Sequence, residues 1–214
     1  IQDFGFGKKT GIQLPGESKG IFRHYKKWSG VDIAMHSFGQ GIAVTGVQMV
    51  QAISCIANNG RCPKPRIINY ISDHEFETRE STAITLSEPI ISPETAHHVN
   101  EIMQDVVNMG TGQSVKIKGY QMAGKTGTAQ KARKDGKGYE TGAYVASFIG
   151  FFPVYDPEYV ILVAVDSPKK QYYGSVVAGP VFKNIAQDII NYKRILPDRF
   201  IKKKHAFKNA LVGL

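Results

Sequence analysis

The chain has 214 residues, 42% of them hydrophobic, so it is long enough for one large domain with a substantial buried core. Its 27 Lys and Arg residues outnumber its 18 Asp and Glu residues, and the formal charge of +9 is typical either of a basic surface with no dedicated partner, the preferred interpretation, or of a protein with acidic partners. The basic residues are mostly not interleaved with aromatic ones as in a nucleic-acid groove, so no nucleic-acid partner is expected. No apolar run approaches the length of about 18 residues that a membrane-spanning helix needs.

The chain opens with IQDFGFGKK, which has neither an initiator Met nor the charged-then-apolar pattern of a signal peptide. We therefore expect that Ile1 is a cut point and that a further segment preceded it. The two cysteines, Cys55 and Cys62, lack a Cys/His cluster at zinc spacing, so no metal and no cofactor is expected. A small buried thiol is the expected role of Cys55, and a Cys55–Cys62 disulfide in an oxidising compartment stays open as the alternative.

Residues 1–41 are rich in glycine and turn signals, which predicts an ordered loop with short helical pieces. The next segment is predicted to be a helix with Thr45 as its N-cap and Asn59-Gly60 as its stop signal. The apolar face expected for this helix consists of Val47, Val50, Ile53, Ser54 and Ala57. Two short strands, which could pair as a ribbon, are predicted within 63–72 and 81–87.

A second helix is predicted from Ser92, its N-cap, with Pro93 in the first helical position and Gly110 closing it. The apolar face expected here consists of Val99, Ile102, Met103, Val106 and Val107. Of the adjacent His97 and His98, one ring is expected to pack and the other to be solvated.

Three strands with short connections are predicted next, over 120–131, 144–153 and 158–166. A final helix follows over 175–194, with an apolar face expected at Val181, Phe182, Ile185, Ile189 and Tyr192. Hairpin-length turns join antiparallel strands, so this order predicts an α+β fold in which helices pack on an antiparallel sheet. The basic tail after the helix is interpreted as a solvated extension, with a short helix lying on a surface as the open alternative.

The stretch GYQMAGKTGT, residues 119–128, admits two interpretations. From Gly119 it matches G-x-x-x-x-G-K-T, the loop that cradles nucleotide phosphates. That loop needs a buried strand before it and a helix that begins at Lys125-Thr126. The segment before Gly119 is lysine-alternating, and the segment after Thr126 is glycine-rich with few apolar residues. The nucleotide-binding interpretation is therefore the minor alternative.

If the same stretch is a strand, its side chains alternate between two faces in a sensible pattern. Thr126 and Thr128 then point the same way and offer two hydroxyls to one ligand, with the charge of Lys125 beside them. Gly127 allows another backbone to lie close against the strand, as an extended peptide does when it binds a sheet edge. The combination suits a peptide that ends in a carboxylate.

The surrounding sequence resembles a known family. FGFGKKTGIQLPGES, HSFGQGIAVTGVQMVQAISCIANNG, GYQMAGKTGTAQKA, YVASFIGFFPVYDP and YYGSVVAGPVF are similar, in order, to the C-terminal half of a class B penicillin-binding protein. The similarity covers about residues 1–190, and the F-G-Q-G element resembles the division-specific subgroup. The resemblance implies the fold shared by serine β-lactamases and penicillin-binding-protein transpeptidases, an antiparallel sheet packed between helices, of which this chain carries the C-terminal portion only.

The resemblance also implies a chemistry. In this family a serine attacks the carbonyl of a terminal D-Ala-D-Ala and releases the last D-Ala, and the acyl group of the resulting acyl-enzyme is then passed to the amine of a neighbouring stem peptide. β-Lactam antibiotics mimic the dipeptide and acylate the serine. Carried over to this sequence, the catalytic residues are Lys125, which supplies a positive field, and Thr128, whose backbone N–H is half of the oxyanion hole. The substrate-binding residues are Thr126, Gly127 and Thr128, with the two hydroxyls on the substrate carboxylate.

Two elements of the family pattern do not occur where they are expected. The family also needs S-x-x-K, which carries the nucleophile, and S-x-N. The only S-x-x-K here, 167–170, follows the last strand, so Ser167 is interpreted as a decoy. No S-x-N exists, and the near miss Ser72-Asp73-His74 has the wrong third residue. The chain is therefore expected to carry one wall of the active site and to be inactive without the missing N-terminal half.

On this interpretation residues 1–193 are the C-terminal part of a transpeptidase domain, and 194–214 are the basic tail. The domain part has a helical region over about 1–110 and the sheet strands and final helix over about 119–193. The implied partners are peptidoglycan stem peptides, β-lactams, the missing half of the same protein and divisome membrane proteins. The implied location is the cell envelope, at the periplasmic face of the inner membrane.

Other functions stay open on the residues alone. A β-lactamase or sensor of the same fold would need a deacylating base, for which the sequence shows no candidate. A non-catalytic module could use the basic surface on wall polymers. Gly39-Gln40-Gly41 is expected to be a structural turn, with a loop beside the cleft as the alternative. Tyr172-Tyr173-Gly174 is expected to cap the final helix, with a cleft contact left open.

Overall fold

The computed structural model describes residues 1–72, 79–81, 83–133, 138–198 and 200 of the 214-residue chain. The chain divides into two compact units, Ile1–His97 and His98–Leu214. It combines α-helices with antiparallel sheets, as the predicted α+β class requires. Among the described residues, no helix is both long enough and apolar enough to cross a bilayer.

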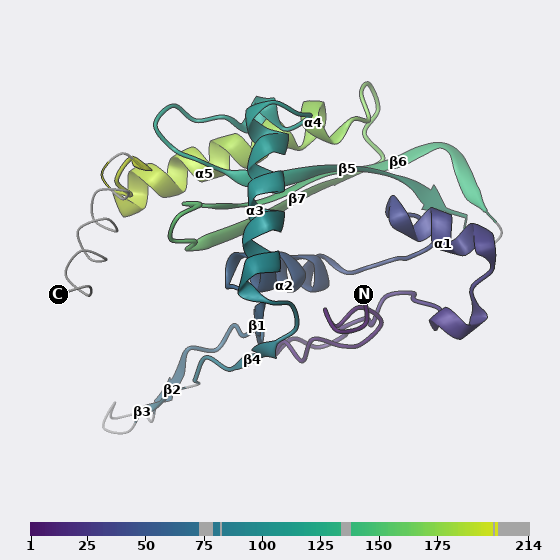
Figure 1. Ribbon diagram of the computed structural model, residues 1–214, viewed down its shortest axis with the longest axis horizontal. Coiled ribbons are helices and arrows are strands. Elements are labelled where there is room, and N and C mark those ends of the chain that lie inside the picture. The colour runs from purple at the N-terminus through teal and green to yellow at the C-terminus, as the bar shows by residue number, and fades with distance from the viewer. Residues whose placement is uncertain (73–78, 82, 134–137, 199, 201–214) are drawn as a thin grey trace. The chain divides into compact units, whose positions relative to one another are not determined.

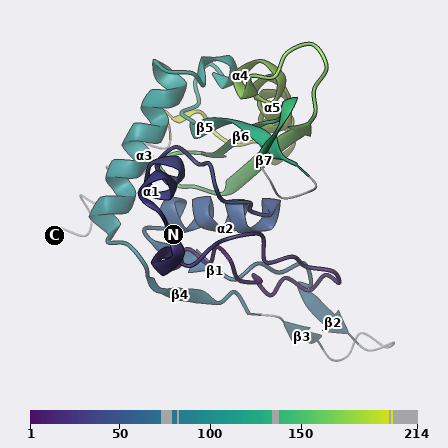
Figure 2. The same ribbon diagram turned by 90° about the vertical axis from the view of Figure 1, so that its right-hand side faces the viewer.

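The first unit contains two helices and two short ribbons. Its elements are η1 (Tyr25–Lys27), α1 (Gly30–Ser37), α2 (Gly46–Ala57), β1 (Arg61–Pro63), β2 (Tyr70–Ser72), β3 (Arg79–Ser81), β4 (Leu86–Pro89) and the first residues of α3 (Pro93–Asn108). The two ribbons, β1 with β4 and β2 with β3, are antiparallel and follow one another (Figures 1 and 2). One strand was predicted within 63–72 and one within 81–87. This was incomplete, because each segment contributes one strand to each of the two ribbons.

Helix α2 begins and ends where local signals predict. Thr45 accepts from the backbone N–H of Gln48, and the Gln48 side chain accepts from the N–H of Thr45, which forms a capping box. After the last turn, Asn59 (φ 52°) and Gly60 (φ 84°) take left-handed conformations. The buried residues of α2 are Gln48, Ala52 and Cys55, and the expected face of Val47, Val50, Ile53, Ser54 and Ala57 is only half-buried.

The error in the buried face of α2 has a physical cause. The pattern of apolar residues excludes glutamine from a core, yet Gln48 is 1% exposed. Its Nε2 donates to the carbonyl oxygens of Lys8 (2.7 Å) and Lys19 (3.0 Å), so the buried amide is fully paired and fixes the N-terminal loop.

A disulfide joins Cys55 of α2 to Cys62 of β1. The expectation of a free buried thiol at Cys55 was therefore wrong, and the alternative that the sequence left open is confirmed. The cause is the tight reversal at Gly60, where a Cβ atom would collide with the carbonyl oxygen of Ile91. The reversal sends β1 back past the end of the helix and brings the two cysteines together.

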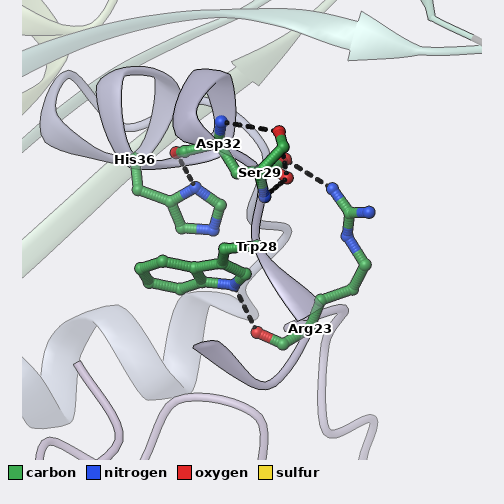
Figure 3. A network of polar contacts seen from close by, with 5 residues as sticks. All are labelled: Arg23, Trp28, Ser29, Asp32 and His36. Atoms are coloured by element: carbon green, nitrogen blue, oxygen red, sulfur yellow. Dashed lines mark hydrogen bonds and ion pairs between the residues drawn. The ribbon is translucent and has the colours of Figure 1, made fainter. Parts of the chain in front are cut away.

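Residues 21–41 fold around a small aromatic and polar network (Figure 3). Trp28 donates from Nε1 to the carbonyl oxygen of Arg23 (2.7 Å), and its ring lies 4.1 Å from that of His36. Asp32 accepts from the backbone N–H of Ser29 (2.7 Å) and from the guanidinium of Arg23. The Ser29 amide and hydroxyl, together with Arg23, hold the pKa of Asp32 below its usual range.

The network confirms the ordered loop with short helical pieces that was predicted for residues 1–41. The turn Gly39-Gln40-Gly41 ends α1: both glycines have positive φ (83° and 76°), and Gln40 donates from its N–H to the carbonyl oxygen of Met35. These contacts support the structural role that was expected for the turn.

The second unit is a three-stranded sheet with helices. Its elements are the remainder of α3, η2 (Gln113–Val115), β5 (Ala123–Ala132), β6 (Tyr139–Phe152), β7 (Tyr159–Asp166), α4 (Gly174–Val177) and α5 (Gly179–Lys193). The strand order is β5-β6-β7, with every pairing antiparallel, as the short connections predict. Strand β5 is therefore an edge strand (Figure 1).

Helix α3 confirms the predicted cap, because Ser92 Oγ accepts from the N–H of Thr95 and Pro93 is the first helical residue. The expected apolar face was only partly right. Ala96, Met103 and Val107 are buried, but Ile102 is 63% exposed. His97 and His98 are both exposed, so the expectation that one ring packs was wrong.

The predicted helix over 175–194 is in fact two helices, α4 and α5, with the break at Ala178 before Pro180. The expected face of α5 was largely wrong. Phe182, Ala186 and Ile190 are buried, whereas Val181, Ile185 and Tyr192 are 43%, 38% and 82% exposed. The helix packs through small residues, since a Cβ atom at Gly179 would collide with Ser114 Oγ. A hydrophobicity pattern gives such residues little weight.

The core of this unit lies between the sheet and α5. Phe148 of β6 and Phe182 of α5 meet edge-to-face with ring centroids 4.7 Å apart, and both are fully buried. After α5 the chain returns to the sheet: Tyr120 donates its hydroxyl to the carbonyl oxygen of Ile195, and Asp198 is buried. The prediction that the tail is a solvated extension is thus wrong for its first residues, and 201–214 lie outside the described part.

Candidate functional site

The G-K-T-G stretch forms a β-strand. Residues Ala123–Ala132 are all in β5, and nine of them pair in register with β6. A phosphate-binding loop requires a helix that starts at Lys125-Thr126, and none starts there. The structure therefore excludes the nucleotide-binding alternative and confirms the extended strand at the sheet edge.

The pairing register decides which side chains share a face. Thr126 lies opposite Phe148, and Thr128 lies opposite Ala146. Since directly opposed residues share a face, both threonines point to the face that carries α5, as the alternation predicts. Lys125 belongs to the opposite face and is exposed. Its ammonium donates to the carbonyl oxygen of Thr126 (2.9 Å).

Each threonine hydroxyl has a partner from another element of the same unit. Thr126 Oγ1 lies 2.9 Å from Thr111 Oγ1, in the loop that follows α3. Thr128 Oγ1 accepts from the backbone N–H of Gly174, the first residue of α4, at 3.3 Å. Thr128 is exposed, and Thr126 is half-buried. Sequence reasoning missed Thr111, whose contact spans 15 residues.

The β5–β6 pair also meets α4, through Gly174, while a Cβ atom at Gly127 would lie 2.5 Å from Ser147 Oγ. A Cβ atom at Gly174 would lie 2.6 Å from the carbonyl oxygen of Gly127 and would collide with that of Ser147. Gly174 is thus the residue that lets α4 sit on the β5–β6 pair, and Ser114 Oγ holds the next residue of α4 by donating to the carbonyl oxygen of Ser175 (2.8 Å). In the sequence, the only hint of this close packing was a glycine directly before a predicted helix.

Lys131, Asp166 and Ser167 form a polar cluster, here called the clasp, at the C-terminal end of β5. The Lys131 ammonium lies 2.7 Å from the Asp166 carboxylate at the end of β7, and it also donates to Ser167 Oγ (3.1 Å). The hydrogen bonds from Lys131 and Ser167 hold the pKa of Asp166 below its usual range. Ser167 follows β7 in a left-handed conformation (φ 50°), not at the start of a helix, which supports its interpretation as a decoy.

Three tyrosines lie close to the C-terminal end of β5. The rings of Tyr144 and Tyr172 are stacked at 4.4 Å, and the ring of Tyr173 lies 4.5 Å from that of Tyr172. The hydrogen bond between the two neighbouring hydroxyls raises the pKa of Tyr172. Tyr173 is the N-cap residue of α4 but makes no side-chain cap bond, so the expected capping role is fulfilled by its backbone position only.

The described residues contain no cluster of three His, Cys, Asp or Glu side chains that could hold a metal ion. The near miss at Ser72-Asp73-His74 lies outside the described residues after Ser72. Hydroxyl and ammonium groups gather on β5 at Thr126, Thr128 and Lys125, a set that suits an anionic ligand.

Comparison with known proteins identifies the fold. The family model for the penicillin binding protein transpeptidase domain matches residues 1–187. The chain belongs to this family. It is 39% identical over 212 residues to stage V sporulation protein D of Bacillus subtilis, across 98% of this chain and 32% of the relative. It is 33% identical over 218 residues to the peptidoglycan D,D-transpeptidase FtsI homolog of Mesostigma viride, across 92% and 36% respectively.

Solved structures of transpeptidase-family proteins agree. Penicillin-binding protein 3 of Mycobacterium tuberculosis matches with a TM-score of 0.84 and 33% identity, over 92% of this chain and 46% of that chain. The same mycobacterial protein has been solved with aztreonam and with ampicillin. These matches confirm the predicted family and fold class. The chain spans about a third of the length of the curated relatives it matches.

Proposed function

We propose that this chain forms one wall of the active site of a peptidoglycan D,D-transpeptidase that β-lactams inhibit. The observation that carries the proposal is the edge strand β5, which presents the K-T-G-T residues of a penicillin binding protein transpeptidase domain in extended form. The nucleophilic serine is not among these 214 residues, so we propose that another part of the full gene product supplies it.

Each residue of the strand has a chemical role in this proposal. An edge strand leaves half of its backbone N–H and C=O groups unpaired, so an extended peptide can bind along it. The N–H of Thr128 stabilises the oxyanion, and the hydroxyls of Thr126 and Thr128 hold the terminal carboxylate of the D-Ala-D-Ala dipeptide. The ammonium of Lys125 adds positive charge from the other face, where it bonds the Thr126 carbonyl oxygen, and Gly127 leaves room for the substrate backbone.

Acylation by labelled penicillin tests the proposal. The full gene product is expected to become covalently labelled, and the Lys125→Ala variant at least about tenfold more slowly, because a charge-assisted contact is lost. Lys118→Ala is the matched control, since Lys118 is also an exposed lysine of the same unit and lies outside β5. The isolated 214-residue chain is expected to stay unlabelled. Labelling of that chain, or none of the gene product, would contradict the proposal.

The same experiment separates the alternatives within the fold. A transpeptidase stays acylated, whereas a β-lactamase would release hydrolysed label in repeated turnovers. A non-catalytic binding module would not be labelled at all.

The proposed location is the cell envelope, at the periplasmic face of the inner membrane, and two observations support a compartment outside the cytoplasm. The D,D-transpeptidase relative is named for peptidoglycan, and the Cys55–Cys62 disulfide is typical of oxidising compartments. The F-G-Q-G element at 38–41 supports a division-specific role with divisome membrane proteins as partners. Cells that lose the gene are then expected to form filaments, and normal septation would argue against this role.

A further inference from the structure

Thr111 is placed to act on the ligand through Thr126. The two hydroxyl oxygens lie 2.9 Å apart, and either one could donate. We propose that Thr111 is a positioning residue that directs the Thr126 hydroxyl proton toward the carboxylate of the substrate or inhibitor. The inference rests on the proposed function of β5.

The loop that carries Thr111 is held firmly where α3 ends. The backbone N–H of Gly110 donates to the carbonyl oxygen of Asp105 (3.0 Å), and that of Gly112 donates to the carbonyl oxygen of Val106 (2.8 Å). A Cβ atom at Gly112 would lie 3.0 Å from this same carbonyl oxygen, so the loop packs tightly against the end of α3. Thr111 therefore has a fixed backbone although its side chain is exposed.

Thr126 and Gly112, the residue that follows Thr111, both lie near the same core residue. Phe148 lies directly opposite Thr126 in the β5–β6 register. The position of a Cβ atom at Gly112 is 3.4 Å from Phe148 Cε2. Phe148 is 0% exposed and packs on α5. The strand that carries Thr126 and the loop that carries Thr111 thus lie beside one buried core residue.

When an anion binds, the chemistry of the hydroxyl group fixes which of the two threonines donates and which accepts. A threonine hydroxyl has one proton to donate and two lone pairs that accept. When Thr126 donates its proton to a carboxylate, it can no longer donate to Thr111, so Thr111 must donate to Thr126. The resulting chain, from Thr111 through Thr126 to the carboxylate, strengthens each bond by polarisation, and the gain is largest for a charged acceptor.

The test uses acylation rates of the full gene product with benzylpenicillin and with its methyl ester, which lacks the charged carboxylate. Thr111→Val is expected to slow acylation by benzylpenicillin about fivefold, the effect of one net hydrogen bond. The same variant is expected to change the rate with the ester less than about twofold, because a neutral acceptor gains little. Thr111→Ser keeps the hydroxyl and is expected to restore the wild-type rate.

A double-mutant cycle decides whether Thr111 acts through Thr126. If it does, Thr111→Val has no further effect in a Thr126→Val background. Additive losses would instead mean that Thr111 touches the carboxylate itself, and equal losses with acid and ester would mean a structural role; either result overturns the inference. Unchanged melting temperatures exclude misfolding. Failure of the proposed function is distinguishable, since the wild-type protein would then not be labelled at all.

Discussion

Replacing Gly174 by alanine tests whether the seating of α4 determines the geometry of the K-T-G-T strand. The added Cβ would lie 2.6 Å from the carbonyl oxygen of Gly127 and would collide with that of Ser147. Both are backbone atoms, so no flexible side chain can yield, and α4 must move away from the sheet. Overpacking of this kind costs about 2 kcal/mol. The movement also breaks the hydrogen bond from the Gly174 N–H to Thr128 Oγ1.

The effect on chemistry follows from the effect on position. A displacement of about 1 Å at a binding group lowers rates by up to about a hundredfold, so Gly174→Ala is expected to slow penicillin acylation at least about tenfold. Acylation rate and thermal melting of the full gene product measure the two consequences. Gly30→Ala is the matched control, because a Cβ atom at Gly30 meets nothing within 4 Å and its φ is not positive. If Gly174→Ala behaves like that control, the close contact does not constrain the site.

Two further predictions concern the clasp and the disulfide. The pKa of Asp166 is lowered in the folded protein, so its contribution to stability is present at neutral pH and is lost as the pH falls below about 4 and through the folded pKa. Asp166→Asn should therefore lower the melting temperature at pH 7 but not at pH values below both pKa values; a constant difference would argue against the pairing with Lys131. Removing the disulfide with Cys55→Ser and Cys62→Ser should lower the free energy of unfolding by about 2 kcal/mol, and reductant should then have no effect on the variant's melting curve.

Local signals predicted the parts of the fold that depend on neighbouring residues. The caps at Thr45 and Ser92, the stop at Asn59-Gly60 and the alternation in β5 each act within a few residues. The hairpin order of three strands followed from connection length alone. The family resemblance supplied the roles of the K-T-G-T residues, which chemistry alone would have left open.

The parts that could not be predicted depend on contacts between distant segments. Gln48 is buried because two loop carbonyls accept from it, and α5 packs through glycine and alanine where the pattern favoured larger side chains. The partners of the strand hydroxyls are equally distant. Thr111 lies 15 residues from Thr126, and Gly174 lies 46 residues from Thr128. No periodicity in a single segment indicates such pairs.

These distant contacts explain how an edge strand can be both open and rigid. A strand that must accept a peptide along its outer side cannot be stabilised by another strand there, and open edges are prone to fraying and to wrong pairings. Strand β5 is instead tied from its face and its end: Thr126 to the loop after α3, Thr128 to α4, and Lys131 to the end of β7. Each tie uses a side chain of β5, so none of them needs a second strand on the outer side, where we propose that the ligand binds. Loss of one tie should therefore change the affinity for an extended ligand without unfolding the sheet, because the pairing of β5 with β6 is untouched.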